Sequence, residues 1–519
     1  MKAFSKKEGW IKVVRPDIIP PSLKDNRADV DRIIKSLEKA LDGEAVTMDL
    51  PFMKRTPSLT RQYGYRLNAV LYKGDKAWQV LNIFPIEEDR PLYGLAMDLG
   101  SATIVIRFID LNTQQRVGEI SFLNPQLEIG PDILTRIHFA NEEGGLEKCR
   151  SLLVYGINKE IAHWTAGKGI DVASIVGVSV AGNTTMTHFL LGLDPYGLCR
   201  EPYIPVVNKP GIITAENLGL DIFPTAPVLI FPNVGSYFGG DLIAGILATG
   251  MSETEEVTML IDVGTNAEVV IGNSEWLMAC AGAAGPALES GVASMGMMAG
   301  PGVIERVVFN SGTKTFRTTT IGHRPPLGIC GSGLIDLVAQ LFLAGMIDMR
   351  GRFVENKCGE RLTSIEGVKH FILVASRDTA GGKDITISQP DIDALIRSKA
   401  AMYTILTTIT QMVHLSIKDL RHIFIAGTFG SFINSKSAVN IGMLPDLPLE
   451  TYRPMGNTSL AGAEMALLSE EARDHISMIR DRVTYVELNV NQDFMNLFNA
   501  ARFIPHTDRA LFPSVKGDQ

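Results

Sequence analysis

The pattern of apolar and polar positions predicts a helix and then short strands at the amino end of the chain. Apolar residues recur at helical spacing from Val30 to Leu41, after a polar segment that can cap a helix. Residues 46–88 carry shorter apolar stretches and predict strands separated by polar turns. We interpret residues 1–90 as a small N-terminal α+β unit that opens with an extended, proline-containing segment.

One arrangement of apolar residues around a turn then occurs twice. The apolar run 92–97 leads into DLGSAT at 98–103, and the run 257–261 leads into DVGTN at 262–266. A second apolar run follows each turn, so each copy predicts a buried strand, an Asp-x-Gly turn and a returning strand. The chain therefore contains an internal repeat at the level of a motif.

Strand and helix patterns alternate around these two copies. Apolar runs at 175–180, 228–231 and 423–426 end in glycine-containing turns, and helical patterns follow the first two at 184–191 and 241–248. Such alternation is typical of α/β architecture.

Composition narrows the class of protein. The chain has 519 residues, 45% hydrophobic and 20% charged, and no stretch reaches the roughly 18 apolar residues that a membrane span needs. The amino end lacks the apolar core of a secretory signal. The formal net charge of −8 argues against nucleic acid or an anionic membrane as the main partner.

The cysteines predict a cytoplasmic protein without an iron–sulfur cluster of its own. Cys149, Cys199, Cys280, Cys330 and Cys358 are scattered, and no CxxC pair occurs among them. Neither a zinc ribbon nor a ferredoxin-type cluster fits that spacing within one chain. An odd, sparse set is typical of reduced thiols in the cytoplasm.

The two Asp-x-Gly turns have the chemistry to bind the phosphates of a nucleotide. Their glycines allow sharp turns, and successive backbone N–H groups can cradle phosphate oxygens. Asp98 and Asp262 would hold Mg²⁺ through its water molecules, because Mg²⁺ gives up water reluctantly. One copy alone would more simply be a hairpin turn, but two copies at strand ends favour phosphate binding. The phosphate-binding candidates are Gly100, Ser101, Thr103, Gly264, Thr265 and Asn266.

Two further glycine-rich turns extend the candidate site. The strand at 423–426 runs into Gly427, Gly430 and Ser431, where an adenosine can lie against the backbone. An ordinary strand-to-helix turn has the same pattern. The GICGSG stretch at 328–333 either approaches the nucleotide or lets a helix pack closely.

Asp241, in the stretch FGGDLIAG, has two interpretations. It stands where a helix should begin, so it can be an N-cap worth roughly 1 kcal/mol. A carboxylate at that place can also orient or deprotonate the nucleophile in phosphoryl transfer. One side chain can serve both purposes.

Taken in order, DLGSAT, VSVAGNTT, GGDLIAG, IDVGTN and AGTFGS resemble a superfamily that contains acetate and sugar kinases, heat-shock chaperone ATPases and actin. The resemblance implies two ribonuclease-H-like domains facing an ATP cleft. It divides the chain into the N-terminal unit 1–90, a first half 91–255 and a second half 256–519 with C-terminal helices. It also implies that Asp241 is the catalytic base, as in sugar kinases.

Residues 15–508 resemble more closely the reductive activators of corrinoid proteins. The stretches IPPSLKDNRADVDRI (19–33), ACAGAAGPALESG (279–291) and MGNTSLAGA (455–463) carry this resemblance, together with VSVAGNTTMTHFLLG, GICGSGLIDLVAQL and INSKSAVNIGMLPD. It implies an ATPase that uses ATP and Mg²⁺ to restore cob(I)alamin from cob(II)alamin in a methyltransferase system. It adds Gly285 to the nucleotide-binding candidates and a corrinoid protein as partner.

The chain departs from that family in its cysteines and in two turn residues. Family members carry iron–sulfur clusters, and here no cysteine precedes Cys149 or follows Cys358. We therefore expect a separate electron donor, such as a ferredoxin-like protein, while a cluster shared across a homodimer stays open. Ala102 stands where the family usually has a hydroxyl residue, and Thr428 stands where it usually has glycine. Whether ATP turnover survives these two differences stays open.

Two other functions compete with corrinoid activation. A small-molecule kinase would use Asp241 as the base for a substrate hydroxyl. A nucleotide-dependent binding module would bind ATP with little turnover. The identity of the corrinoid protein, the methyl donor and the oligomeric state stay open.

Overall fold

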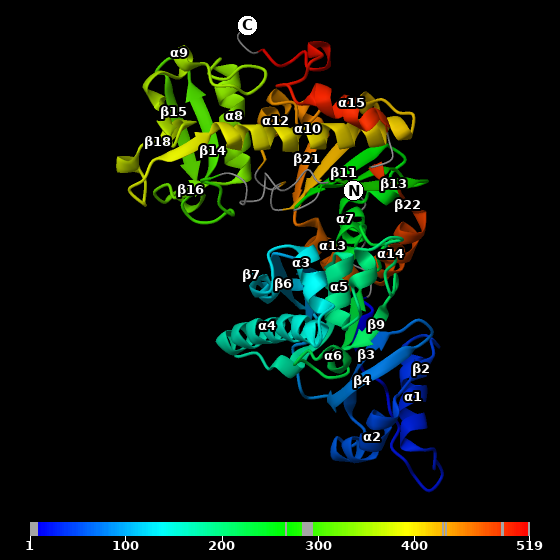
Figure 1. The fold of residues 1–519 in the computed structure, drawn as a ribbon. Helices are drawn as coiled ribbons and strands as arrows, with labels where there is room; N and C mark the ends of the chain where they lie inside the picture. Colours follow the sequence, from blue (N-terminus) through cyan, green and yellow to red (C-terminus); the bar gives the residue numbers. More distant parts are fainter. Residues whose placement is uncertain are drawn as a thin grey trace. The chain divides into compact units, whose positions relative to one another are not determined.

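The computed structural model describes residues 9–264, 267–282, 294–427, 430, 433–488 and 492–516. The chain divides into two compact units, each with helices and sheets (Figure 1). The first contains Met1–Ala248 and Ser459–Asp481, and the second contains Thr249–Thr458 and Arg482–Gln519. Among the described residues, no helix combines the length and the apolar character that crossing a membrane requires.

The amino-terminal part of the first unit has the small α+β character predicted from the sequence. Its sheet has the strand order β1-β3-β4-β2. Ile33 and Leu37 of α1 share an apolar core with Phe52 of α2 and Trp78 of β4. The elements are β1 (Ile11–Val14), α1 (Asp29–Ala40), β2 (Val46–Thr47), α2 (Leu50–Gln62), β3 (Leu67–Lys73) and β4 (Trp78–Pro85).

The prediction of strands alone for residues 46–88 was wrong, because α2 lies within that stretch. Asp49 caps this helix, and its Oδ1 accepts a 2.9 Å hydrogen bond from the N–H of Phe52. The helix continues through Pro57, which conceals it in the sequence. The hydroxyl groups of Thr56 and Thr60 turn back onto the carbonyls of Phe52 and Thr56, at 2.9 Å each.

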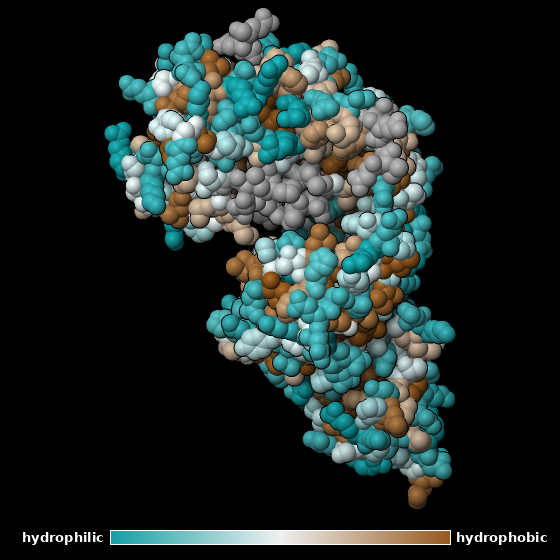
Figure 2. Space-filling view, in the orientation of Figure 1, coloured by the Kyte–Doolittle hydropathy of each residue, from teal (hydrophilic) through white to brown (hydrophobic). Residues whose placement is uncertain are grey.

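One buried arginine shapes the segment before α1. Arg32, 2% exposed, donates from Nη1 to the carbonyl of Ile19 at 2.9 Å and to Oδ2 of Asp25 at 2.7 Å. Its Nη2 donates to the carbonyl of Arg27 at 3.3 Å. Leu23 projects into solvent from the loop held in this way, and Figure 2 shows hydrophobic atoms at that tip. Arg32 thus has a carboxylate to balance its charge.

A six-stranded sheet of order β7-β6-β5-β8-β10-β9 forms the centre of the first unit. Strands β5, β6 and β7 are successively antiparallel, β8 is parallel to β5, and β10 is parallel to β8. The carboxyl ends of β5, β8 and β10 therefore meet at one edge. The elements are β5 (Tyr93–Leu99), β6 (Thr103–Asp110), β7 (Gln115–Leu123), α3 (Ile133–Ala140), α4 (Gly145–Lys168), β8 (Ile175–Gly182), α5 (Thr184–Leu191), β9 (Gly211–Thr214), α6 (Ala215–Leu218), β10 (Pro227–Ile230) and α7 (Gly240–Thr249).

The second unit repeats five strands of this topology, and its sixth strand, β22, pairs in parallel with β13 at the opposite edge. Its main sheet has the order β21-β20-β11-β12-β13-β22. Strands β11, β12 and β13 are successively antiparallel, and β20 and β21 continue in parallel from β11. The predicted α/β fold of two similar halves is confirmed. The elements are β11 (Thr258–Val263), β12 (Ala267–Gly272), β13 (Leu277–Gly282), α10 (Gln389–Met412), β20 (His422–Ala426), α12 (Ser435–Asn440), β21 (Tyr452–Gly456), β22 (Val483–Tyr485) and α15 (Gln492–Ala501).

Two small sheets lie between β13 and α10 in sequence. Their strand orders are β15-β14-β16 and β17-β18-β19. Helix α8 packs on β14, and its buried apolar residues join the core that α10 shares with the main sheet. The elements are β14 (Val303–Asn310), β15 (Thr315–Thr320), β16 (Gly328–Ile329), α8 (Gly331–Leu343), α9 (Glu355–Cys358), β17 (Leu362–Ile365), β18 (Val368–Val374) and β19 (Ile385–Ser388).

Two C-terminal helices return to the first unit. They are α13 (Thr458–Leu468) and α14 (Glu470–Arg482), and residues 459–481 belong to that unit. A Cβ on Gly462 would lie 2.1 Å from the carbonyl oxygen of Ala244, so glycine is what lets α13 lie directly against α7. The predicted division of the chain after residues 90 and 255 placed these helices in the second half.

Candidate functional site

The first Asp-x-Gly turn joins β5 to β6. Asp98 is in the last part of β5, and Thr103 begins β6. A Cβ on Gly100 would lie 2.3 Å from the carbonyl oxygen of Thr103, so a side chain at this position would break the turn. The turn therefore depends on glycine where the sequence places it, and it leaves Ser101 and Ala102 at the carboxyl edge of the sheet.

Asp98 is oriented by a residue that the sequence had not singled out. The hydroxyl of Ser459 donates a 2.8 Å hydrogen bond to Oδ1 of Asp98. Ser459 lies in the first turn of α13 and is 6% exposed. Its stretch, MGNTSLAGA, carried the family resemblance without assigning this role.

Asp241 lies beside Asp98 at the same edge of the first unit. It is in the first turn of α7, and its Oδ1 accepts a 2.9 Å hydrogen bond from the N–H of Leu242. Burial and the neighbouring Asp98 carboxylate raise the pKa of Asp241 to about 7. A carboxyl group with that pKa exchanges protons readily near neutral pH, which suits a general base.

Glycines bring the segment before Asp241 close to the end of β8. A Cβ on Gly239 would lie 2.5 Å from Cα of Asn183, and one on Gly240 would lie 2.6 Å from Cβ of Phe231. Asn183 caps α5, accepting a 2.9 Å hydrogen bond from the N–H of Met186. The turns after β5, β8 and β10 therefore converge, as their parallel strands predict.

The second unit places Asp262 against the glycine turn after β20. Asp262 of β11 is in register with Ala426 of β20. Gly427 has a φ of +81°, and a Cβ there would lie 2.8 Å from Oδ1 of Asp262 and 2.9 Å from the carbonyl oxygen of Val263. The structure thus brings the second Asp-x-Gly turn and the predicted adenosine turn together.

Several predicted site residues cannot be placed. Gly264 and Gly430 are described, and a Cβ on Gly430 would lie 2.5 Å from the carbonyl oxygen of Ile425. Thr265, Asn266, Gly285 and Ser431 lie outside the described residues, as does the departure at Thr428. Their roles stay predictions.

The GICGSG stretch supports close packing in the second unit. A Cβ on Gly333 would lie 2.5 Å from the carbonyl oxygen of Ile304, and one on Gly328 would lie 2.4 Å from Sδ of Met297. Glycine at these two positions lets α8 and β16 approach their neighbours. This geometry accounts for the pattern without a nucleotide.

The donor atoms of the two Asp-x-Gly turns fit Mg²⁺. Asp98, near the end of β5, and Asp262, near the end of β11, each offer hard carboxylate oxygens. Mg²⁺ is commonly held by one or two carboxylates, with water and substrate phosphates completing its shell. No group of three or more His, Cys, Asp or Glu residues capable of holding a metal occurs within the described part of the chain, so a cage built only from side chains is not seen there.

The five cysteines are separate thiols, and four of them are buried. Burial raises the pKa of Cys149 and of Cys358 to about 11, and that of Cys280 to about 12. Cys330 donates to the carbonyl of Ile304 at 3.3 Å. Thiols of this kind are inert at neutral pH, because the thiolate is the reactive and ligating form.

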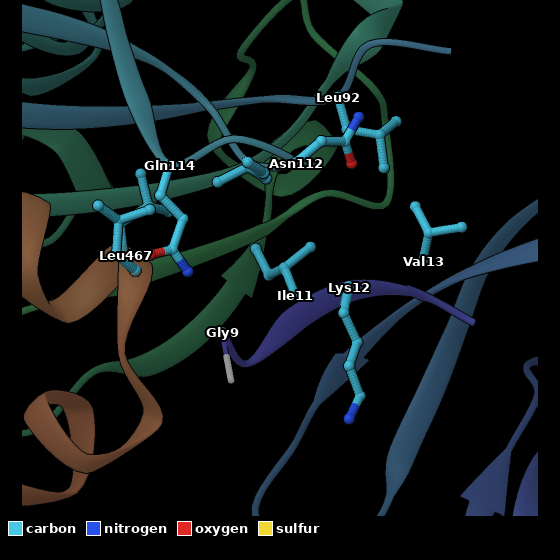
Figure 3. A pocket seen from close by; sticks show the side chains of 10 residues that line it. Gly9, Ile11, Lys12, Val13, Leu92, Asn112, Gln114 and Leu467 are labelled. Atoms are coloured by element: carbon cyan, nitrogen blue, oxygen red, sulfur yellow. The ribbon is translucent and has the colours of Figure 1, made fainter. Parts of the chain in front are cut away.

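A cavity of about 250 Å³ in the first unit lies away from these carboxylates (Figure 3). It is lined by Ile11, Leu92 and Leu467, among others, and Leu92 precedes β5 whereas Asp98 is near its carboxyl end. The Lys12 side chain points away from the apolar lining and lies over the ring of Trp78, 4.4 Å from its centroid. The cavity is therefore not part of the candidate site.

Family comparisons cover almost the whole chain. The model for the RACo linker region matches residues 11–90, and that for the RACo middle region matches residues 93–254. The model for the C-terminal domain of RACo, described as the ASKHA domain, matches residues 256–516.

Individual relatives agree with these matches. Corrinoid activation enzyme RamQ of Eubacterium limosum is 30% identical over 479 residues, which are 91% of this chain and 79% of that protein. A reductase of the Co(II) methylated amine-specific corrinoid protein, from Methanosarcina barkeri, is 21% identical, and the match covers 78% of this chain and 76% of that protein. The solved structure of a reductive activator for a corrinoid, iron–sulfur protein has a TM-score of 0.92 and 36% identity, covering 99% of this chain and 82% of the other.

Proposed function

The chain belongs to the RACo family, and on this premise we propose that it is a Mg²⁺-dependent ATPase that activates a corrinoid protein. The reaction it supports is the reduction of cob(II)alamin to cob(I)alamin in a methyltransferase system. The observation that supports this function best is the pair of carboxylates, Asp98 and Asp241, at the carboxyl edge of the first sheet.

We propose that the nucleotide is bound by the residues predicted from the sequence. Gly100, Ser101 and Thr103 of the first turn would bind phosphate oxygens, as would Gly264, Thr265 and Asn266 of the second. Gly285, Gly427, Gly430 and Ser431 would complete the nucleotide site. Asp98, oriented by Ser459, and Asp262 would hold Mg²⁺, which supplies charge neutralisation for the phosphates when it is bound.

Asp241 is proposed to act on the attacking water. The water oxygen forms a bond to the γ-phosphorus, and the bond from that phosphorus to the β–γ bridging oxygen breaks. The ionised Asp241 carboxylate accepts the proton that the water loses, and ADP and inorganic phosphate are released. With a pKa of about 7, a substantial part of Asp241 is ionised at neutral pH.

The electron would come from another protein. One electron from a ferredoxin-like donor converts Co(II) to Co(I), and ATP hydrolysis by this chain would time that transfer. The five separate thiols support a donor outside the chain, since four of them are buried. The corrinoid protein is the proposed partner, since the relatives act on such proteins.

The decisive experiment measures ATP hydrolysis anaerobically, with and without a cob(II)alamin protein and a reduced ferredoxin. The cobalt oxidation state is followed by absorbance in the same samples. We expect hydrolysis to rise in the presence of the corrinoid protein and cob(I)alamin to form only with ATP. Hydrolysis that responds to small alcohols but not to the corrinoid protein would identify a kinase. Tight ATP binding without turnover would identify a binding module.

A further inference from the structure

We propose that Arg136 and Asn124 are positioning residues for nucleotide phosphates. They fix the peptide groups of the first Asp-x-Gly turn from behind, and Arg136 adds a buried positive charge there. This inference rests on the proposed function, because it requires that the turn bind the phosphates of ATP. It concerns side chains outside every motif recognised in the sequence.

Asn124 and Arg136 together hold three consecutive carbonyls of the turn, two through their side chains and one through the Asn124 backbone. The Asn124 side-chain amide donates to the carbonyl of Gly100 at 3.0 Å, and the Asn124 backbone N–H donates to that of Ala102 at 2.9 Å. Between them, Nη1 of Arg136 donates to the carbonyl of Ser101 at 2.7 Å. All three carbonyls are therefore hydrogen-bonded, and the Asn124 and Arg136 side chains lie on the same side of the turn, since both approach Sδ of Met186.

Peptide planarity determines what the other side presents. In a trans peptide group the N–H points opposite to the C=O. The Gly100 and Ser101 carbonyls point toward Asn124 and Arg136, so the N–H groups of Ser101 and Ala102 point away from them. Two successive N–H groups on one side are the usual cradle for a phosphate oxygen. Ala102 can serve here without a hydroxyl, because its backbone supplies the donor.

Arg136, unlike the buried Arg32, does not form an ion pair with any carboxylate that the structure describes. The side chain is fully buried, and its two hydrogen bonds to oxygen go to the carbonyls of Ser101 and Gly130, the latter at 2.9 Å from Nε. Nη2 has no hydrogen-bond partner among the described residues. Burial lowers the pKa of Arg136, yet arginine stays protonated. The Asp132 carboxylate acts on Arg136 electrostatically but does not form an ion pair with it. A buried charge without a directly paired counterion is costly, and an anionic ligand would offset that cost.

Both side chains also contact α5, the helix that follows the neighbouring turn of the site. Sδ of Met186 in α5 lies 3.7 Å from Nδ2 of Asn124 and 4.0 Å from Nη1 of Arg136. The helix that contains Met186 begins after Asn183, at the end of β8. Asn124 and Arg136 thus link the turn after β5 to the helix that follows β8. Their support of the phosphate-binding turn therefore does not depend on a single hydrogen bond.

The test compares binding of adenosine, AMP, ADP and ATP by calorimetry, with Mg²⁺, in the full chain. In the Arg136→Gln variant we expect the loss of affinity to grow with the number of phosphates, to about 10- to 100-fold for ATP, with adenosine unchanged. Arg136→Lys keeps the charge and should recover part of the ATP affinity. Arg32→Gln is the matched control, because Arg32 is equally buried but paired with Asp25, and it should leave all four affinities unchanged.

Asn124→Asp is a second test variant, which can be measured if Arg136→Gln does not fold. The change is isosteric, retains the Oδ1 that accepts from the N–H of Gln126, and places a negative charge behind the turn. It too should weaken ATP more than adenosine. An equal effect on all four ligands, or none, in a folded variant would overturn the inference alone. A wild-type chain that binds adenosine and ATP equally would overturn the proposed function as well.

Discussion

The carboxylate of Asp98 accepts a 2.8 Å hydrogen bond from the hydroxyl of Ser459, a residue 361 positions later in the chain. The contact exists because residues 459–481, which include most of α13, return to the first unit between two segments of the second unit. Asp98 and Ser459 thus join the carboxyl end of β5 to a helix from the C-terminal part of the chain. A hydrogen bond to one oxygen fixes the direction of the other, which is what a metal or water ligand requires.

Ser459→Ala tests this relationship. Hydrogen bonds to charged groups are worth about 1.5–3 kcal/mol. If that energy is expressed in the transition state, ATP turnover should fall about 10- to 100-fold. Ser469→Ala is a suitable control, because the Ser469 hydroxyl, just beyond the other end of α13, accepts from the N–H of Ala472 at 3.2 Å. The control should lose some thermal stability and keep its turnover.

Removal of either predicted Mg²⁺ ligand should abolish turnover without unfolding the chain. We expect Asp98→Ala and Asp262→Ala each to cost several kcal/mol of transition-state stabilisation, since the phosphates would lose a cation. Steady-state ATPase assays and circular dichroism measure the two parts of this prediction. Asp89→Ala, at an exposed carboxylate, should match the wild type. Full activity in both test variants would reject these two residues as ligands.

The sequence predicted the fold well because the fold depends on local patterns. The apolar stretches that lead to Asp98 and Asp262 form β5 and β11. The Asp-x-Gly turn that follows each of these strands indicated a duplicated sheet. Helix α2 was missed for a local reason. Pro57 argues against a helix in the sequence. The hydrogen bonds from the Thr56 and Thr60 hydroxyls to backbone carbonyls of the helix can be recognised only in the structure.

The site was predicted only where its chemistry lies in a motif. Asp98, Asp241 and Asp262 stand in recognisable turns, and the structure places the first two together. Ser459, Asn124 and Arg136 reach the first turn from other elements, so no spacing along the chain announces them. An arginine that binds carbonyls has no sequence signature at all.

Asp241→Asn should lower hydrolysis far more than ATP binding. The amide keeps an oxygen that can accept from the N–H of Leu242 but cannot take a proton from water. Because burial raises the pKa of Asp241, wild-type turnover should rise with pH as the base ionises, and the Asp241→Asn variant should not show that rise. Equal turnover numbers in the two proteins would return Asp241 to a structural role.

The same pKa has a consequence for stability. Between about pH 4 and pH 7 folded Asp241 holds a proton that the unfolded chain has lost, so the free energy of unfolding falls as pH rises. The amide that replaces this carboxyl group in the Asp241→Asn variant does not ionise. The stability of that variant relative to wild type should therefore increase from pH 5 to pH 8, as denaturant titrations at several pH values can measure.

The purified chain should be colourless and free of iron. Cys149, Cys280 and Cys358 are buried thiols whose pKa values are raised, and thiolates are the form that binds iron. Anaerobic purification followed by iron and sulfide analysis tests this. Stoichiometric iron and sulfide would contradict this prediction and support a cluster shared across a homodimer. The variants Cys280→Ala and Cys330→Ala would then show whether those thiols bind the cluster.

Corrinoid activation also requires that nucleotide and partner influence each other. A ligand shifts an equilibrium only through its different affinities for two states, so an activator driven by ATP must bind its corrinoid protein differently in the ATP and ADP forms. Linkage for binding is reciprocal. A cob(II)alamin protein should therefore tighten binding of a non-hydrolysable ATP analogue, and the analogue should tighten the partner by the same factor. A typical coupling of about 1–3 kcal/mol corresponds to roughly 5- to 150-fold.

Calorimetric titration of the analogue, with and without the corrinoid protein, measures this coupling directly. The cob(III) form of the same protein is the matched control, because an activator that responds to the inactive state should distinguish the two oxidation states of cobalt. A kinase would show no coupling to either form, and a small alcohol would change its nucleotide affinity instead. Identical analogue affinities with and without a cob(II)alamin protein that demonstrably binds the chain would contradict activation by ATP, because binding energy that does not differ between nucleotide states cannot drive a cycle.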